Sequence, residues 1–285
     1  MRVSVSVGED RADEVGARLT TAGAIALTLL PAEGNAGEVL EPDPGRMPTW
    51  RAVRLEGLFA VDVDLSPLAG LDVNVDFVPD RDWSETWREG FGPLRFGHLL
   101  VVPSATELRT RCDDVVLSLD PGLAFGTGTH ATTALCLERL TEMPLEGKRV
   151  LDVGCGSGIL AIAAARLGAT AMAVDHDPQA RRATVANSRD NGVEIVVESA
   201  LADVDSQFDV VIANLVANTI RTLAQALLQR LLPSGELVLS GILPGQVKWV
   251  MEAFASDCDF QFETPTLRDG WAMLRGVRCP NPTNR

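Results

Sequence analysis

The sequence contains no long apolar run. A membrane-spanning helix needs about 20 consecutive apolar residues, and no stretch of this chain reaches that length. The longest candidate, residues 22–30, is too short and has neither a basic flank nor a small-residue cleavage site. We therefore expect a cytoplasmic protein that neither spans a membrane nor is exported.

Cysteine and histidine are few and scattered. The cysteines are odd in number and include no Cys-x-x-Cys pair, so they indicate neither a disulfide framework nor a zinc site. We expect reduced cysteines, as in the core of a cytosolic protein. The histidines are equally dispersed, and no metal site is implied. These residues are Cys112, Cys136, Cys155, Cys258 and Cys279, and His98, His130 and His176.

Positive charge is also scarce. Acidic residues outnumber basic ones, and the formal net charge is −14. Because a nucleic-acid backbone needs a basic face, nucleic acid is not expected as a partner, whereas a basic protein or a cationic side chain is compatible with this charge. Residues 1–80 carry fourteen acids, six arginines and no lysine, a net charge of −8. This acidic segment serves either solubility or the electrostatic docking of a partner.

The first 78 residues have the pattern of a small α+β domain. Val3, Val5 and Val7 alternate with polar residues, which predicts a strand. Trp83 and Trp87 lie four residues apart, on one face of a helix, and predict a linker helix that packs against a neighbouring domain. We expect a helix at 9–22, strands at 24–30, 51–65 and 71–78, a loop at 31–48 and the linker helix at 79–98.

Residues 99–285 alternate between apolar strand runs and helical stretches. Continuous apolar strands joined by helices are typical of a parallel sheet covered on both faces. The predicted fold class is therefore α/β, a Rossmann-like doubly wound sheet. We expect strands at 149–153, 171–174, 194–197, 210–213 and 236–240, helices at 159–167, 178–191 and 219–232, and a last, antiparallel edge strand at 271–277.

A glycine-rich loop follows the first of these parallel strands. The segment Val-Leu-Asp-Val-Gly-Cys-Gly-Ser-Gly at 150–158 leads directly into a helix. Gly154, Gly156 and Gly158 permit a sharp turn and the close approach of a ligand, which in an open parallel sheet binds at the carboxyl ends of the strands. The spacing is G-x-G-x-G rather than the G-x-G-x-x-G of dinucleotide sites. The loop therefore favours a ligand without a pyrophosphate.

Polar side chains end the next strands. Asp175 is placed where a carboxylate can accept both ribose hydroxyls of an adenosine, whereas Asp177 and Pro178 are expected to begin a helix as its cap and first residue. Asn214 ends a further strand, where its amide can accept N–H bonds from an amine and orient the amine lone pair towards a methyl group. Capping of the following helix is the alternative role for Asn214.

A second glycine-rich block lies upstream, at residues 120–133. Gly126 and Gly128 are interleaved with Thr127 and Thr129. This pattern predicts a flexible loop whose hydroxyls and amides face the start of a helix. So many glycines and small hydroxyls in fourteen residues favour a functional loop over a plain connection.

These blocks resemble the ribosomal protein L11 methyltransferase family (PrmA type). The sequence has Asp-Pro-Gly-Leu-Ala-Phe-Gly-Thr-Gly-Thr-His-Ala-Thr-Thr at 120–133, Gly-Cys-Gly-Ser-Gly at 154–158 and Asn-Leu-Val-Ala at 214–217, in the order of the family. The block at 126–130 is more specific than the glycine loop, which all class I methyltransferases share. The likeness is clear from residue 82 onwards and looser before it. The family's interdomain segment is matched by Trp83, Trp87, Phe91, Pro93 and Phe96.

The resemblance implies a ferredoxin-like substrate-recognition domain at 1–78 and a class I methyltransferase domain at 99–285. It implies an enzyme that transfers methyl groups from S-adenosylmethionine to lysine ε-amines and the N-terminal α-amine of ribosomal protein L11. We expect the protein to be a monomer. Asn214 and His130 would be the catalytic residues. The expected cofactor-binding residues are Phe125, Gly126, Thr127, Gly128, Thr133, Gly154, Gly156, Gly158, Asp175 and Asn214.

A lysine substrate must lose its proton before it can attack, because its unperturbed pKa is about 10.4. We expect a desolvated channel, lined by Phe125 and backbone carbonyls, to lower that pKa. His130 is the nearby candidate base, although positioning of the amine alone can suffice.

The chain departs from the family's pattern in the N-terminal domain. Only residues 66–70 separate two predicted strands where a ferredoxin-like domain needs its second helix. We expect this helix to be deleted or reduced to a turn.

Three alternatives stay open at this point. A lysine methyltransferase acting on another protein, such as the electron-transfer flavoprotein beta subunit, would share the catalytic blocks but generally lack the N-terminal unit. An assembly protein could bind the cofactor without turnover, although the complete set of motifs disfavours this. A nicotinamide oxidoreductase is disfavoured by the G-x-G-x-G spacing and by Asn214.

Overall fold

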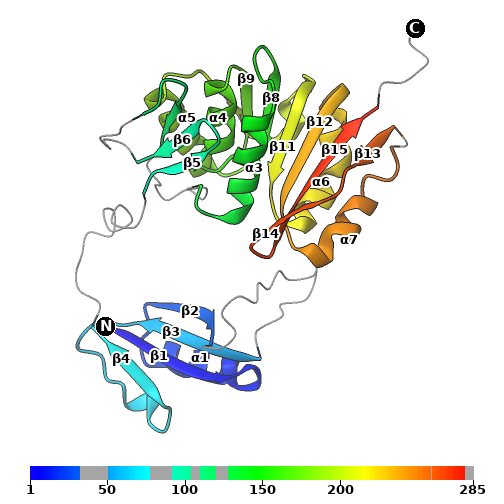
Figure 1. The fold of residues 1–285 in the computed structure, drawn as a ribbon. Coiled ribbons are helices and arrows are strands. Elements are labelled where there is room, and N and C mark those ends of the chain that lie inside the picture. Colours follow the sequence, from blue (N-terminus) through cyan, green and yellow to red (C-terminus); the bar gives the residue numbers. More distant parts are fainter. Residues whose placement is uncertain (33–50, 78–91, 104–109, 120–127, 258, 280–285) are drawn as a thin grey trace. The chain divides into compact units, whose positions relative to one another are not determined.

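The chain forms two compact units, Met1–Asp82 and Trp83–Arg285, which Figure 1 draws in their sequence colours. This computed structural model describes residues 1–32, 51–77, 92–103, 110–119, 128–257 and 259–279. Within these ranges no helix is long and apolar enough to cross a membrane.

The N-terminal unit is an antiparallel sheet with one helix packed on it. Its strands are β1 (Arg2–Gly8), β2 (Ala26–Pro31), β3 (Ala52–Leu58) and β4 (Val73–Asp76), in the order β2-β3-β1-β4. Helix α1 (Ala12–Thr21) buries Val15 and Leu19 against the apolar side chains of β1 and β3. This order of elements and strands is that of a ferredoxin-like domain without its second helix.

A single 3₁₀ turn, Ser66–Leu68, occupies the place of the second helix. Leu68 is buried in the core of the unit. The Arg18 guanidinium of α1 donates to the Pro67 carbonyl at 2.9 and 3.1 Å and to the Ala69 carbonyl at 2.8 Å. The predicted reduction of this helix to a turn is confirmed.

The strand predicted at 51–65 is too long, because β3 ends at Leu58. Leu58 pairs with Arg2 of β1 and with Ala26 of β2, which are the end residues of both neighbouring strands. The chain beyond Leu58 therefore has no strand to pair with. The alternating pattern there does not mark a strand, and Val61 is 70% exposed.

The C-terminal unit contains the predicted doubly wound sheet. Its parallel strands are β8 (Arg149–Val153), β9 (Thr170–Val174), β10 (Val196–Glu198), β11 (Phe208–Asn214) and β12 (Leu231–Ile242), in the order β10-β9-β8-β11-β12. Three antiparallel strands extend it beyond β12: β15 (Trp271–Arg278), β13 (Phe260–Phe262) and β14 (Thr266–Arg268).

Two predictions for this sheet need correction. The last strand, β15, is antiparallel as expected but lies between β12 and β13 rather than at an edge. The helix predicted at 219–232 ends at Gln229, because Leu231 and Leu232 already belong to β12. Both leucines continue an apolar pattern, so periodicity alone does not separate the helix from the strand.

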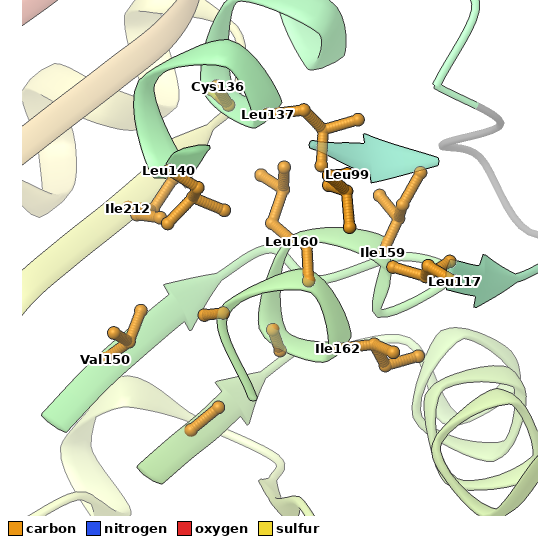
Figure 2. Packing of buried hydrophobic residues seen from close by; sticks show 14 of the residues in the cluster. Leu99, Leu117, Cys136, Leu137, Leu140, Val150, Ile159, Leu160, Ile162 and Ile212 are labelled. Atoms are coloured by element: carbon orange, nitrogen blue, oxygen red, sulfur yellow. The ribbon is translucent and has the colours of Figure 1, made fainter. Parts of the chain in front are cut away.

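Helices cover both faces of the sheet (Figure 1). Val150 and Ile212 point to a core formed with α3 (Ala131–Glu142) and α4 (Ile159–Arg166), which Figure 2 shows from close by. The next residues along the same strands, Leu151 and Ala213, point to a second core formed with α6 (Ala217–Gln229) and α7 (Val247–Glu252). Helix α5 (Pro178–Asp190) packs against β10 and α4.

A small sheet of β5 (Leu94–Phe96), β6 (Leu99–Val102) and β7 (Val115–Ser118) precedes α3. Most of the linker helix predicted at 79–98 falls outside the described residues. Its last part is not helical, because Leu94–Phe96 pairs with residues 99–101 through a turn at Gly97 with a φ of 54°.

Candidate functional site

A cavity of ≈ 210 Å³ lies at the carboxyl ends of β8, β9 and β11. This is the edge of a parallel sheet at which ligands bind. Its lining joins four separate segments of the sequence, each of which contributes at least one predicted residue. Five predicted cofactor residues line it: Thr133, Gly154, Gly156, Asp175 and Asn214.

The glycine loop is held close to the segment that follows β11. Gly154 has a φ of 78°, and a Cβ atom there would lie 2.3 Å from Cδ2 of Leu215. No other residue type fits without displacing Leu215. The backbone N–H groups of Gly154 and Cys155 both donate to the Val174 carbonyl, at 2.8 and 3.1 Å. These contacts place the loop between the ends of β9 and β11.

Asp175 joins two loops at the rim of the cavity. Its Oδ2 accepts a hydrogen bond from the Gly156 N–H at 2.9 Å, and its Oδ1 accepts one from the Asp177 N–H at 3.0 Å. The residue is only 8% exposed, so these two bonds hold the carboxylate in one orientation. Each carboxylate oxygen can accept a further hydrogen bond. The predicted ribose-binding group is therefore preorganised at this edge.

Arg181 of α5 supports this strand end, a role that no sequence motif indicates. Its Nη1 donates to the carbonyl oxygens of Asp175 at 2.8 Å and His176 at 2.9 Å. The guanidinium thus ties the first turns of α5 to the segment that carries the carboxylate. Arg181 is one of several arginines in α5, so its sequence position alone gives no signal of this role.

Asn214 is oriented by a side chain from another part of the chain. Its Nδ2 donates to Oγ1 of Thr133 at 3.2 Å, which leaves Oδ1 as an acceptor. Helix α6 has its N-cap at Val216. Asn214 therefore does not cap this helix, and that alternative for it is wrong. The cap predicted at Asp177 is confirmed, because its carboxylate accepts from the Gln179 N–H at 2.8 Å.

His130 does not line the cavity. It is the N-cap of α3, where Nδ1 accepts from the Thr132 N–H at 3.4 Å and lies 2.8 Å from Oγ1 of Thr132. The imidazole also packs edge-on against the Trp271 ring, with 5.0 Å between the ring centroids. These contacts give His130 a structural role at the start of the helix that carries Thr133.

The other predicted residues fall into two groups. The first group is described but does not line the cavity: Gly128 is buried with a φ of 84°, and Gly158 is the N-cap of α4. Phe125, Gly126 and Thr127 lie outside the described residues.

A buried acid lies beneath the cavity, and the sequence analysis did not single it out. Asp152 of β8 is 1% exposed, and its Oδ2 accepts from the Ala161 N–H at 3.2 Å. Its Oδ1 has no hydrogen-bond partner among the described residues. Burial, reinforced by the negative charge of Asp175, raises the pKa of Asp152 to about 7.

The thiol in the cavity wall is not a nucleophile at neutral pH. Burial raises the pKa of Cys155 to about 12, and the nearby Asp152 carboxylate adds to this effect. The protonated thiol is unreactive. Of the other described residues that line the cavity, only Asp175 and His176 are ionisable. The arrangement therefore suits the binding and orientation of a ligand better than covalent catalysis.

The chain is similar to known methyltransferases over nearly its whole length. The model of the family described as Ribosomal protein L11 methyltransferase (PrmA) matches residues 1–279. The protein of that name from Methylococcus capsulatus is 46% identical, with 97% of this chain and 98% of the relative covered. The one from Nitrosococcus oceani is 39% identical over the same shares. A crystal structure of the ribosomal protein L11 methylase from Lactobacillus delbrueckii subsp. bulgaricus is 33% identical and superposes with a TM-score of 0.62, covering 66% of this chain and 100% of that one.

Proposed function

The chain belongs to the ribosomal protein L11 methyltransferase family, and from this we propose that it methylates lysine ε-amines and the N-terminal α-amine of ribosomal protein L11. The methyl donor is S-adenosylmethionine. The observation that carries the proposal is the cavity that brings Asp175 and Asn214 together at one edge of the sheet. We further propose that the N-terminal unit, residues 1–78, recognises the protein substrate.

The residues that line the cavity fit this cofactor. The Asp175 carboxylate would accept the ribose hydroxyls, because its orientation is already fixed by two backbone N–H groups. Gly154 and Gly156 contribute only backbone to the cavity lining after β8, so the chain can approach a ligand closely there. When bound, S-adenosylmethionine supplies an electrophilic methyl group. The basic side chain of a lysine substrate also suits a chain with a net charge of −14.

Asn214 would orient the substrate amine. Its Oδ1 is the acceptor of the amide, since Nδ2 donates to Thr133. An amine that donates an N–H to Oδ1 has its lone pair held in one direction, and such orientation supplies a large part of the rate of a bimolecular step. His130 caps α3 and does not line the cavity. We therefore propose that the amine loses its proton to water on desolvation, without a dedicated base.

Intact-mass spectrometry tests the proposal directly. Ribosomal protein L11 from the same organism is incubated with this protein and S-adenosylmethionine, and stepwise increments of one methyl group are expected. If no increment appears while the protein binds S-adenosylhomocysteine, the substrate is another protein. A lysine methyltransferase with a different target is the second candidate, because the residues that line the cavity would bind the cofactor and the amine but do not determine which protein carries that amine.

We infer from the proposed substrate that the enzyme works in the cytoplasm, where ribosomal proteins are made. The expectations of a monomer and of no direct contact with nucleic acid stay predictions.

A further inference from the structure

The N-terminal unit leaves an apolar groove open between α1 and β2. The groove has a volume of ≈ 350 Å³, and its walls include Gly16 and Ala17 of α1 and Leu27 and Leu29 of β2. Leu27 is 42% exposed and Leu29 is 37% exposed. Strand β2 is an edge strand of the sheet. Two leucines on one side of an edge strand thus face solvent beside a helix that only partly covers them.

Helix α1 is tied on its other side to the turn that replaces the second helix. Arg18 bonds the carbonyls of Pro67 and Ala69, which ties α1 to the segment that leads into β4. Strand β4 lies at the opposite edge of the sheet from β2. At Gly16 an added Cβ would already contact Leu27 at 3.4 Å, so the helix backbone itself forms part of the wall. Helix α1 packs mainly on β3, the neighbour of β2, and therefore covers Leu27 and Leu29 only in part.

The rim of this groove is acidic. Asp13 lines it and is exposed. Its carboxylate forms no ion pair with another residue of the described part. The basic residues at the start of α1 and within it are engaged elsewhere. Arg11, the N-cap of α1, and Arg18 both pair with Glu14, and Arg18 also bonds the turn. An unpaired carboxylate beside exposed leucines favours a partner that is both basic and apolar.

We propose that this groove docks a basic, amphipathic segment of the protein substrate, with apolar side chains against Leu27 and Leu29 and lysine or arginine side chains on Asp13. This role rests on the proposed function, since the groove would be the surface through which the enzyme selects its protein substrate. A nucleic acid does not fit, because its phosphates would meet carboxylates. Few buried anchors carry most of the energy of such an interface, so the leucines should dominate and the rim charge should act mainly on the association rate.

Paired variants of the full chain test this proposal. Leu27→Ser removes an anchor, and Val61→Ser is its control, because Val61 is an exposed apolar residue of the same unit outside the groove. Asp13→Lys reverses the rim charge, and Asp62→Lys is its control at an exposed site away from the groove. The readouts are the KM for ribosomal protein L11, kcat, the Kd for S-adenosylhomocysteine and the unfolding temperature.

Leu27→Ser should raise the KM for ribosomal protein L11 about tenfold, which corresponds to roughly 1.4 kcal/mol. Asp13→Lys should raise it about threefold at low salt and less at high salt, because the interaction of an exposed charge is screened. In both variants kcat and cofactor affinity should stay within about a factor of two. The controls should match the wild type.

Three results would overturn the inference, and they are distinguishable. If the wild-type chain binds S-adenosylhomocysteine but adds no methyl group to ribosomal protein L11, both the proposed function and the docking role of the groove are wrong. If methylation is normal and the KM is unchanged in both groove variants, only the docking role of the groove is wrong. A wild-type dimer in sedimentation that Leu27→Ser dissociates would assign the groove to a second copy of the chain.

Discussion

The cavity of the C-terminal unit and the groove of the N-terminal unit differ in whether their polar groups already have partners within the chain. In the cavity, Asp175 and Asn214 are held by hydrogen bonds before any ligand arrives. At the groove, Asp13 has no ion-pair partner in the described part of the chain, and the leucines beside it are open. A site for a small ligand gains affinity from preorganised polar groups. The groups of a docking surface, in contrast, must stay available to contact the partner. Substitutions in the two regions should therefore affect different constants.

The largest effect is expected from the buried acid beneath the cavity. The pKa of Asp152 is raised to about 7 in the folded chain, from an ordinary value of 3.8. Between these values the folded state holds a proton that the unfolded state has lost, so stability falls as pH rises from about 4 to 7 and is level above that. The loss of folding free energy over this range is at most about 4 kcal/mol, because each unit of difference between the two pKa values corresponds to roughly 1.36 kcal/mol.

Asp152→Asn should remove this part of the pH dependence. Denaturant unfolding at pH 5 and pH 8 should show a smaller loss of stability on raising the pH than in the wild type. Asp209→Asn serves as the control, because the pKa of that carboxyl is lowered by bonds to Arg149 and Lys148. An unchanged slope in Asp152→Asn would contradict the raised pKa.

Asp175→Ala tests the preorganised side of the comparison. It removes the one acidic side chain that lines the cavity in the described chain, and hydrogen bonds to a charged group contribute about 1.5–3 kcal/mol each. The Kd for S-adenosylhomocysteine, measured by calorimetry, should rise about 100-fold, which corresponds to roughly 2.7 kcal/mol. Asp177→Ser is the control, since it keeps a helix cap. A change below about threefold would place the ribose elsewhere.

Asn214→Ala separates orientation of the amine from binding of the protein substrate. Misplacement of a reacting group by 1 Å can cost about 100-fold in rate, so kcat should fall by that order while the KM for the protein stays near the wild-type value. Thr133→Val removes the hydroxyl that accepts from Nδ2 and should give a smaller loss. A rise in KM without a loss of kcat in Asn214→Ala would assign this residue to docking instead.

Arg181→Gln tests whether the support behind Asp175 matters for the cofactor. Two hydrogen bonds to the Asp175 and His176 carbonyls would be lost, and a loosened strand end should weaken the binding of S-adenosylhomocysteine about tenfold, or roughly 1.4 kcal/mol. The exposed neighbour Arg182→Gln is the matched control, and Arg181→Lys should restore part of the affinity. Equal Kd values for Arg181→Gln and Arg182→Gln would contradict a role of Arg181 in cofactor binding.

The two units also differ in how far their structure follows from the sequence. Asp175, Gly154 and Asn214 could be predicted because each stands at a strand end within a local motif, and parallel strands bring those ends together. The long strand expected after Arg51 was wrong because the lengths of β1 and β2, not the local pattern, decide where β3 ends. Long-range pairing of this kind also hid β13 and β14, which form only against β15.

Single side chains were missed for a different reason. Arg181 belongs to a helix surface that is rich in arginine, and only the structure shows its two carbonyl partners just after β9. Asp152 stands inside an apolar strand, where its burial, and the lack of a partner for its Oδ1 among the described residues, depend on three-dimensional packing. The open groove could not be predicted either, because it depends on where α1 lies across β3 and β2.

The smallest effect is expected at His130, the residue first considered as a base. In this structure it caps α3 and packs on Trp271, away from the cavity lining. His130→Ala should keep at least about a third of wild-type kcat and the same pH profile, with a stability loss of about 1 kcal/mol that is typical for a lost cap. His130→Asn, which can still cap the helix, should recover that stability. A loss of kcat beyond about 100-fold in both variants, with a shifted pH profile, would restore His130 as a base, since general base catalysis contributes 10²–10⁴-fold.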